Sequence, residues 1–211
     1  MPIDHRVWRI APVLFLFLLL SAFVLKSWLL NLLFLGFFIF HFAFFRDPQR
    51  SPAGEGLISP ADGKVVDIST VHEDRYLQEE AVKVGIFLSV FNVHVNRAPA
   101  EGKVEYIQYI PGKFFNALRE DSVKYNESNW IGIAGKTKIL VRQISGTIAR
   151  RICCDVKIGQ MLQKGEKLGM ICYGSRVECY FPKRLFRAAV KIGDIVKTGH
   201  TVLAVPGESI V

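Results

Sequence analysis

The amino-acid sequence predicts a mainly β protein whose strands form a pseudo-symmetric β-sandwich or flattened barrel with hammerhead-like repeats and one short helix. Three observations indicate this class: an almost uncharged apolar segment near the N-terminus, a series of short β-type stretches from residue 57 onward, and an internal repeat near the C-terminus. They divide the chain into a membrane-associated helical hairpin, residues 1–45, and a globular domain, residues 46–211.

The N-terminal segment is typical of membrane sequence, because Lys26 is the single charged residue between Pro12 and Phe45. One straight helix over this length would extend about 50 Å, well beyond a hydrocarbon core of roughly 30 Å. We therefore expect a break at Lys26-Ser27 and a helical hairpin, with a single tilted span as the alternative. A cleaved signal peptide fits poorly, because the apolar run is too long for one.

Arginines flank this segment on both sides, and such residues favour the cytoplasmic side of a membrane. The expected location is therefore the cell membrane, with the globular domain on the cytoplasmic side. The flanking residues are Arg6, Arg9, Arg46 and Arg50.

The globular domain is predicted to consist mostly of short strands, because β-branched and aromatic runs alternate with Gly, Pro and Asp. One helix is expected over 114–123, between Pro111-Gly112 and a polar Asn-Glu-Ser-Asn stretch. The expected strands are 57–58, 64–68, 82–90, 103–110, 129–134, 138–144, 147–154 and 168–173.

An internal repeat sharpens the fold prediction. Val156-Lys157-Ile158-Gly159, followed by Gly165, returns 34 residues later as Val190-Lys191-Ile192-Gly193, followed by Gly199. Two such strand–turn–strand units resemble the hammerheads of biotinyl and lipoyl carrier domains and indicate pseudo-symmetry.

The composition narrows the classes of partner. The net charge is +8, and next to a membrane segment this excess favours anionic lipid head groups over nucleic acid, for which no recognition motif is present. The four cysteines, at 153, 154, 172 and 179, have neither Cys-x-x-Cys nor histidine spacing. We therefore predict no metal site and reduced, buried structural thiols.

The dipeptide Gly174-Ser175 is the main chemical feature, because two strand-like apolar stretches meet there. A glycine carbonyl is sterically open, so the next serine hydroxyl can attack it if a base takes the proton. A plain β-turn is the structural alternative.

Two further motifs supply that base and its partner. Asp62 lies in Ser59-Pro60-Ala61-Asp62-Gly63, and His94 lies in Phe91-Asn92-Val93-His94-Val95-Asn96-Arg97-Ala98-Pro99. An imidazole can accept the serine proton, while a carboxylate orients and stabilises it. Each motif also has a structural interpretation, a hairpin turn and a core histidine.

These motifs together resemble the short form of the phosphatidylserine decarboxylase family, pyruvoyl-dependent enzymes made as self-cleaving proenzymes. Over most of residues 46–211 the same order also includes Pro111-Gly112-Lys113-Phe114, Asn116-Ala117, Asn126-Glu127 and Gly174-Ser175-Arg176-Val177. Longer members carry a second histidine where this chain has Phe91, so no role of that histidine is transferred.

The resemblance implies that Asp62, His94 and Ser175 form the self-processing triad. Cleavage between Gly174 and Ser175 would give a β chain, 1–174, and an α chain, 175–211, that remain together as a heterodimer. Ser175 would become the pyruvoyl cofactor, with no metal or external cofactor. This group would decarboxylate phosphatidylserine to phosphatidylethanolamine and carbon dioxide through a Schiff base.

Several questions stay open from sequence alone. Two rival functions are a membrane-anchored Ser-His-Asp hydrolase, although the Gly-x-Ser-x-Gly elbow is absent, and a non-catalytic lipoyl-like carrier or adaptor. Homo-oligomer formation is also left open. Arg97, Lys113 and Arg176 are candidates for phosphate binding by charge alone.

Overall fold

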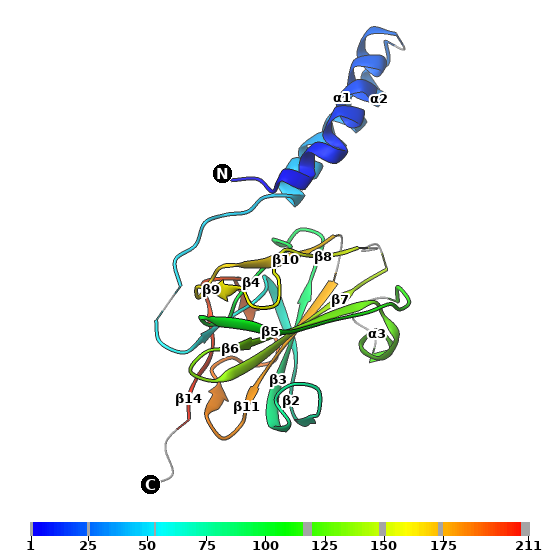
Figure 1. The fold of residues 1–211 in the computed structure, drawn as a ribbon. Helices are drawn as coiled ribbons and strands as arrows, with labels where there is room; N and C mark the ends of the chain where they lie inside the picture. Colours follow the sequence, from blue (N-terminus) through cyan, green and yellow to red (C-terminus); the bar gives the residue numbers. More distant parts are fainter. Residues whose placement is uncertain are drawn as a thin grey trace. The chain divides into compact units, whose positions relative to one another are not determined.

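The computed structural model describes residues 2–24, 26–52, 54–115, 120–147, 151–172 and 175–207. The chain divides into two compact units, Met1–Gln49 and Arg50–Val211. Figure 1 shows that the first unit is helical and the second is built mainly from strands. The mainly β class with N-terminal helices is therefore confirmed.

The first unit is a hairpin of two helices, α1 (Ala11–Phe23) and α2 (Trp28–Phe44), preceded by a short 3-10 helix, η1 (His5–Arg9). Aromatic rings join the helices, with centroids 5.5 Å apart for Phe17 and Phe34 and 6.2 Å apart for Phe15 and Phe38. The expected break at Lys26-Ser27 is confirmed, because Ser27 Oγ accepts a hydrogen bond from the Leu30 backbone N–H at the start of α2.

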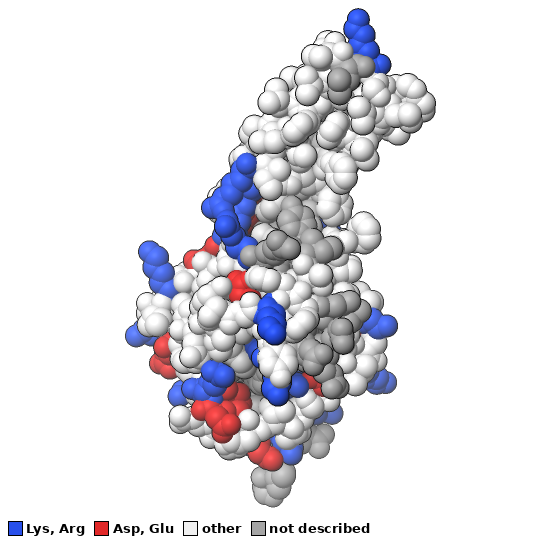
Figure 2. Space-filling view, turned by 90° about the vertical axis from the view of Figure 1, so that its right-hand side faces the viewer, with Lys and Arg blue, Asp and Glu red and all other residues white. Residues whose placement is uncertain are grey.

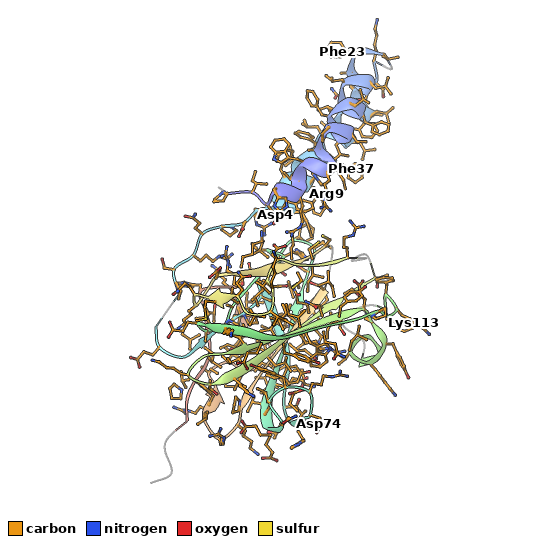
Figure 3. The ribbon with its side chains drawn as sticks, viewed as in Figure 1. Asp4, Arg9, Phe23, Phe37, Asp74 and Lys113 are labelled. Atoms are coloured by element: carbon orange, nitrogen blue, oxygen red, sulfur yellow. The ribbon has the colours of Figure 1, made fainter. Side chains whose placement is uncertain are left out.

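Most of the hairpin surface is apolar and exposed. Phe23 and Trp28 are each 73% exposed, and Figure 3 places Phe23 at one end of the hairpin and Arg9 at the other. In Figure 2 this unit is almost free of charged side chains except at its two ends. Among the described residues, no helix combines the length and the apolar character needed to cross a membrane.

The second unit contains one eight-stranded sheet and two three-stranded sheets, with antiparallel pairing in all three. The large sheet has the order β13-β2-β3-β11-β7-β6-β5-β9, and it twists so strongly that β2 and β5 run in very different directions (Figure 1). Its strands are β2 (Gly63–Glu73), β3 (Glu79–Leu88), β5 (Gly102–Ile110), β6 (Ser128–Ala134), β7 (Lys138–Ser145), β9 (Met161–Leu162), β11 (Ser175–Pro182) and β13 (Ile195–Val196).

The two smaller sheets have the orders β1-β14-β12 and β4-β10-β8. A continuous hydrophobic core includes residues from all three sheets, among them Val177 and Phe181 of β11, Leu168 of β10 and Leu203 of β14. The strands of these sheets are β1 (Leu57–Ile58), β4 (Val95–Arg97), β8 (Ile152–Cys154), β10 (Lys167–Ile171), β12 (Phe186–Ala188) and β14 (Val202–Pro206).

The internal repeat is a structural repeat. The Gly159 N–H donates to Val104 O at 2.8 Å, and Gly193, 34 residues later, donates to Val65 O at 2.8 Å. Gly165 and Gly199 likewise donate to Ala98 O at 2.9 Å and to Ser59 O at 3.0 Å. The predicted pseudo-symmetry is therefore confirmed at the level of individual hydrogen bonds.

Some predicted boundaries were wrong. The expected helix over 114–123 is α3 (Glu120–Tyr125), and Phe114 and Phe115 are not helical, while 116–119 lie outside the described residues. Ser175–Pro182 is a full strand that was not among the expected ones, although strand-like character was noted on both sides of Gly174. Of the expected strand over 147–154, only Ile152–Cys154 is a strand among the described residues, and 148–150 lie outside them.

Candidate active site

Ser175 begins β11, an interior strand of the large sheet, between β3 and β7. It lies opposite Leu88 on β3 and Ser145 on β7, and it is 0% exposed. Its Oγ is buried and makes no hydrogen bond to any described residue. A buried hydroxyl without a partner is costly, and the Oγ of Ser145, directly opposite on β7, is likewise buried without a partner among the described residues. Gly174, the other residue of the expected cleavage site, lies outside the described residues.

His94 directly precedes β4 and is fully buried. Its backbone oxygen accepts a hydrogen bond from Ile171 N at 3.3 Å, which extends the β4–β10 ladder by one residue. Ile171 ends β10, four residues before Ser175 in sequence. The histidine is thus held against the strand that leads into the Gly174-Ser175 bond.

The imidazole of His94 has a defined polarity. Its Nδ1 lies 3.0 Å from the backbone oxygen of Asn92, and a carbonyl oxygen only accepts hydrogen bonds. We therefore assign the proton to Nδ1, which gives Nε2 the lone pair that a general base requires. The loop that positions Asn92 is closed by its own side chain, which accepts hydrogen bonds from Ser89 N at 2.9 Å and Ser89 Oγ at 2.8 Å.

A side-chain hydrogen bond links β4 to the large sheet beside Ser175. Gln143 Nε2 donates to Asn96 Oδ1 at 2.8 Å, and both residues are 0% exposed. Gln143 pairs with Val177, two residues along from the Ser145–Ser175 pair and therefore on the same face of the sheet. Because His94 continues the extended register of β4, it faces the same side as Asn96. The Asn96 side chain is directed toward the large sheet by its hydrogen bond to Gln143.

Asp62 immediately precedes β2, at the same end of the large sheet. Lys64 pairs with Phe87, which places the start of β2 next to Leu88, the partner of Ser175. The approach is close, since a Cβ on Gly63, whose φ is +153°, would lie 2.0 Å from the oxygen of Phe87. Asp62 and Ser175 therefore lie near the same end of the large sheet, while His94 precedes β4 of a smaller sheet.

The carboxylate of Asp62 has its own set of partners. Arg50 donates from Nη1 to Oδ1 and from Nη2 to Oδ2, the latter at 3.1 Å, and Thr198 N donates to Oδ1 at 2.7 Å. The Asp62 side chain is 10% exposed and the Arg50 side chain 17%. The carboxylate is thus fixed by a guanidinium and by a backbone amide. From the sequence, the only partner expected for it was His94.

The candidate phosphate ligands are not equivalent. Arg176 points to the opposite face, where its guanidinium binds Glu178 Oε1 and Asp67 Oδ2 at 3.0 and 3.1 Å. Arg97 donates to Gly165 O at 3.0 Å. The Lys113 ammonium lies 5.6 Å from the centre of the Phe115 ring. Arg176 is therefore held by two carboxylates, while Lys113 remains at the surface.

Two other sequence interpretations concern single residues. Phe91, which stands where longer family members have histidine, is 75% exposed.

Of the four cysteines only Cys179 is buried, and burial raises the pKa of its thiol to about 12. Cys154 is exposed, so the prediction of four buried thiols was wrong. Within the described ranges, no cluster of His, Cys, Asp or Glu has the size needed for a metal ion.

The sequence analysis gave no site role to three residues that form hydrogen bonds at or beside the candidate residues: Arg50, Asn96 and Gln143. Arg50 was interpreted only as a flank of the apolar segment, and Asn96 only as part of a motif. Arg50 is 12 residues from its partner Asp62, and Gln143 is 47 residues from its partner Asn96. A single sequence does not show which of its distant residues form such pairs.

Known proteins resemble this chain over most of its length. The family model of phosphatidylserine decarboxylase matches residues 37–204. A phosphatidylserine decarboxylase proenzyme of Carboxydothermus hydrogenoformans is 49% identical over 183 residues, 85% of each chain. Proenzymes of the same name from Desulfotalea psychrophila and Geotalea uraniireducens are 42% and 43% identical, over 89% and 77% of each chain.

Proposed function

Because the chain belongs to the phosphatidylserine decarboxylase family, it is a carboxy-lyase, and we propose that it matures by cutting itself between Gly174 and Ser175. The observation that supports this proposal is the buried, unpartnered hydroxyl of Ser175 at the start of an interior strand. His94 is held by a backbone hydrogen bond against β10, the strand that precedes Ser175 in the sequence.

In the proposed cleavage, the Ser175 hydroxyl attacks the carbonyl carbon of Gly174 while its proton moves to His94 Nε2. The bond from that carbon to the Ser175 nitrogen breaks, and the nitrogen takes the proton back, so the peptide becomes an ester. Loss of the Cα proton of Ser175 then expels the Gly174 carboxylate from Cβ. The remaining enamine tautomerises to an imine, and water releases ammonia to leave a pyruvoyl group on the 175–211 chain.

The proposed role of Asp62 is electrostatic. A carboxylate at the same end of the sheet stabilises the imidazolium that forms when His94 takes the proton. Asn92 O holds Nδ1–H in place, so the base nitrogen stays directed away from that contact. We propose that orientation comes from Asn92 and charge stabilisation from Asp62.

The pyruvoyl group would supply an electrophilic carbonyl that joins the amine of phosphatidylserine in a Schiff base and takes up the electrons left by carbon dioxide. The protein residues around it exclude water, since Ser175, His94 and Ser145 are all buried. His94 is the proposed donor of the proton that replaces the lost carboxyl group. The product would be phosphatidylethanolamine.

We propose that the helical hairpin inserts into the cell membrane from the cytoplasmic side. A substrate with two acyl chains stays in the bilayer, so only its head group has to reach the site. The exposed apolar side chains of α1 and α2 support insertion, and Arg9 and Arg46 at the open end of the hairpin favour the cytoplasmic face. At 17 residues, α2 is about 25 Å long, shorter than a typical hydrocarbon core.

The test of self-processing is the mass of the purified protein under denaturing conditions. We expect two fragments divided between Gly174 and Ser175, with the smaller one lighter than a serine-started peptide because a pyruvoyl group has replaced the amino acid. The Ser175→Ala variant should stay at full length and be inactive. An uncleaved wild-type chain that still decarboxylates phosphatidylserine would contradict the proposal.

A further inference from the structure

The turn that carries Asp62 occurs twice in this domain. Ser59-Pro60-Ala61-Asp62-Gly63-Lys64-Val65 and Ala98-Pro99-Ala100-Glu101-Gly102-Lys103-Val104 share their Pro, Ala, Gly, Lys and Val positions. The hydrogen bonds match as well: Val65 N donates to Asp194 O and Val104 N donates to Gln160 O, both at 2.9 Å. Asp62 and Glu101 therefore occupy equivalent positions in the two halves of the pseudo-symmetric domain.

The two copies differ in what surrounds the carboxylate. Glu101 is exposed, whereas Asp62 is buried and is bound through both oxygens by Arg50. Arg50 Nη1 also donates to Thr198 O at 3.1 Å, while Thr198 N donates back to Asp62 at 2.7 Å. The three residues form a closed ring of hydrogen bonds that holds the carboxylate in one orientation.

This ring is suited to positioning. A guanidinium that binds a carboxylate with two parallel hydrogen bonds fixes its direction as well as offsetting its charge. A buried carboxylate without a countercharge is unfavourable, so without Arg50 the Asp62 side chain would turn toward solvent or take up a proton. Arg50 contacts Asp62 and Thr198, so its influence on the proposed triad would pass through Asp62.

From this comparison of the two turns we infer that Arg50 is a positioning residue for self-cleavage, acting through Asp62. The inference rests on the proposed function, because it requires Asp62 to assist the cleavage. It also gives the segment just before the first strand a chemical role beyond connecting the two units. Arg50 and Asp62 lie before the proposed cleavage site and Thr198 lies after it, so the ring also joins the two future chains.

The test is a double-mutant cycle on the rate of self-cleavage in the full-length chain, followed by electrophoresis after a pulse of synthesis. We expect Arg50→Gln to slow cleavage on the order of 10- to 100-fold, the range caused by small misplacements of a catalytic group. Arg50→Lys, which keeps the charge and loses the two-pronged contact, should be intermediate. The double variant Arg50→Gln/Asp62→Asn should be no slower than Asp62→Asn alone.

The second turn provides the matched control. Glu101→Gln changes the equivalent carboxylate in the same local fold and should cleave at the wild-type rate. If Asp62→Asn stops cleavage entirely, Asp62→Glu replaces it in the cycle. Thermal unfolding of each variant establishes whether a slowly cleaving chain is folded. If Arg50→Gln does not fold, Arg50→Lys takes its place in the cycle.

Three outcomes would overturn the inference. Arg50→Gln could cleave at the wild-type rate while Asp62→Asn is slow, which removes Arg50 and leaves the proposed function intact. The two slowdowns could multiply in the double variant, which means that Arg50 acts independently of Asp62. Normal cleavage in Asp62→Asn would remove the assigned role of Asp62 and, with it, the route through which Arg50 is inferred to act.

Discussion

Gln143 donates a hydrogen bond to Asn96 at 2.8 Å, and this contact ties the strand beside His94 to the strand beside Ser175. Gln143 Oε1 in turn accepts from Asn129 Nδ2 at 3.0 Å. A buried chain of amides thus extends from β6 through β7 to β4. The chain links β4, which directly follows His94, to the large sheet, and neither Asn96 nor Gln143 has solvent to replace a lost partner.

Gln143→Leu should therefore slow self-cleavage. The substitution leaves Asn96 Oδ1 buried without this donor, which costs about 1–3 kcal/mol of stability, and it frees β4 to shift relative to Ser175. Cleavage would be followed in a pulse of synthesis, and unfolding by circular dichroism. The control is Val141→Ala, which weakens the core two residues further along β7. Equal slowing in both variants would assign the effect to stability rather than to position.

Replacing the proposed base should affect cleavage more than replacing the carboxylate. A positioned general base contributes typically 10²- to 10⁴-fold, so we expect His94→Ala to cleave slower than wild type by about that factor. Asp62→Ala should be slow but less severely affected, because the carboxylate does not itself take the proton. Fragment yields over time measure both. Normal processing of both folded variants would show that the assignment is wrong.

The two fragments should stay associated after cleavage. β11 pairs with β3 from Ser175 to Pro182 and with β7 from Ser175 to Tyr180, and it carries Val177, Cys179 and Phe181 into the core. Size-exclusion chromatography of matured protein should give one peak that contains both fragments, and denaturant should separate them. Elution of the small fragment by itself under native conditions would contradict this expectation.

Thiol labelling offers an independent check on the same strand. Because burial raises the pKa of Cys179 to about 12, its thiol stays protonated and unreactive at pH 8, while the exposed Cys154 should react quickly. Mass spectrometry of labelled fragments should find Cys179 unmodified before and after cleavage. Rapid labelling of Cys179 in matured protein alone would mean that β11 leaves the sheet when it becomes a chain terminus.

Removal of the helical hairpin, residues 1–49, should leave self-cleavage intact, because Asp62, His94 and Ser175 belong to the second unit. Turnover of phosphatidylserine in vesicles should fall much more than turnover of a short-chain soluble analogue, since the hairpin supplies proximity to lipid. Equal losses on the two substrates would indicate a structural role for the hairpin.

Reporters fused at the two ends of the full chain should both lie in the cytoplasm, and signals on opposite sides would favour a single span.

The sequence by itself determined the division into an apolar hairpin and a β domain, because both depend on local patterns. The break at Lys26-Ser27 and the repeat of Val156 to Gly165 at Val190 to Gly199 are visible as charge, turn residues and periodicity. The identities of Asp62, His94 and Ser175 came from the order of motifs. Local propensity also predicted most strands of the large sheet, with errors of a few residues at their ends.

The tertiary structure decided what surrounds each of these residues. Ser175 opens a strand in the interior of the sheet, Arg50 binds Asp62, and Gln143 binds Asn96. These contacts join residues up to 47 positions apart in the chain, and they arise because sheet register and packing bring the strand ends together. A hydrogen bond between distant side chains depends on distance and direction in space, and neither is encoded in the local pattern of a single sequence.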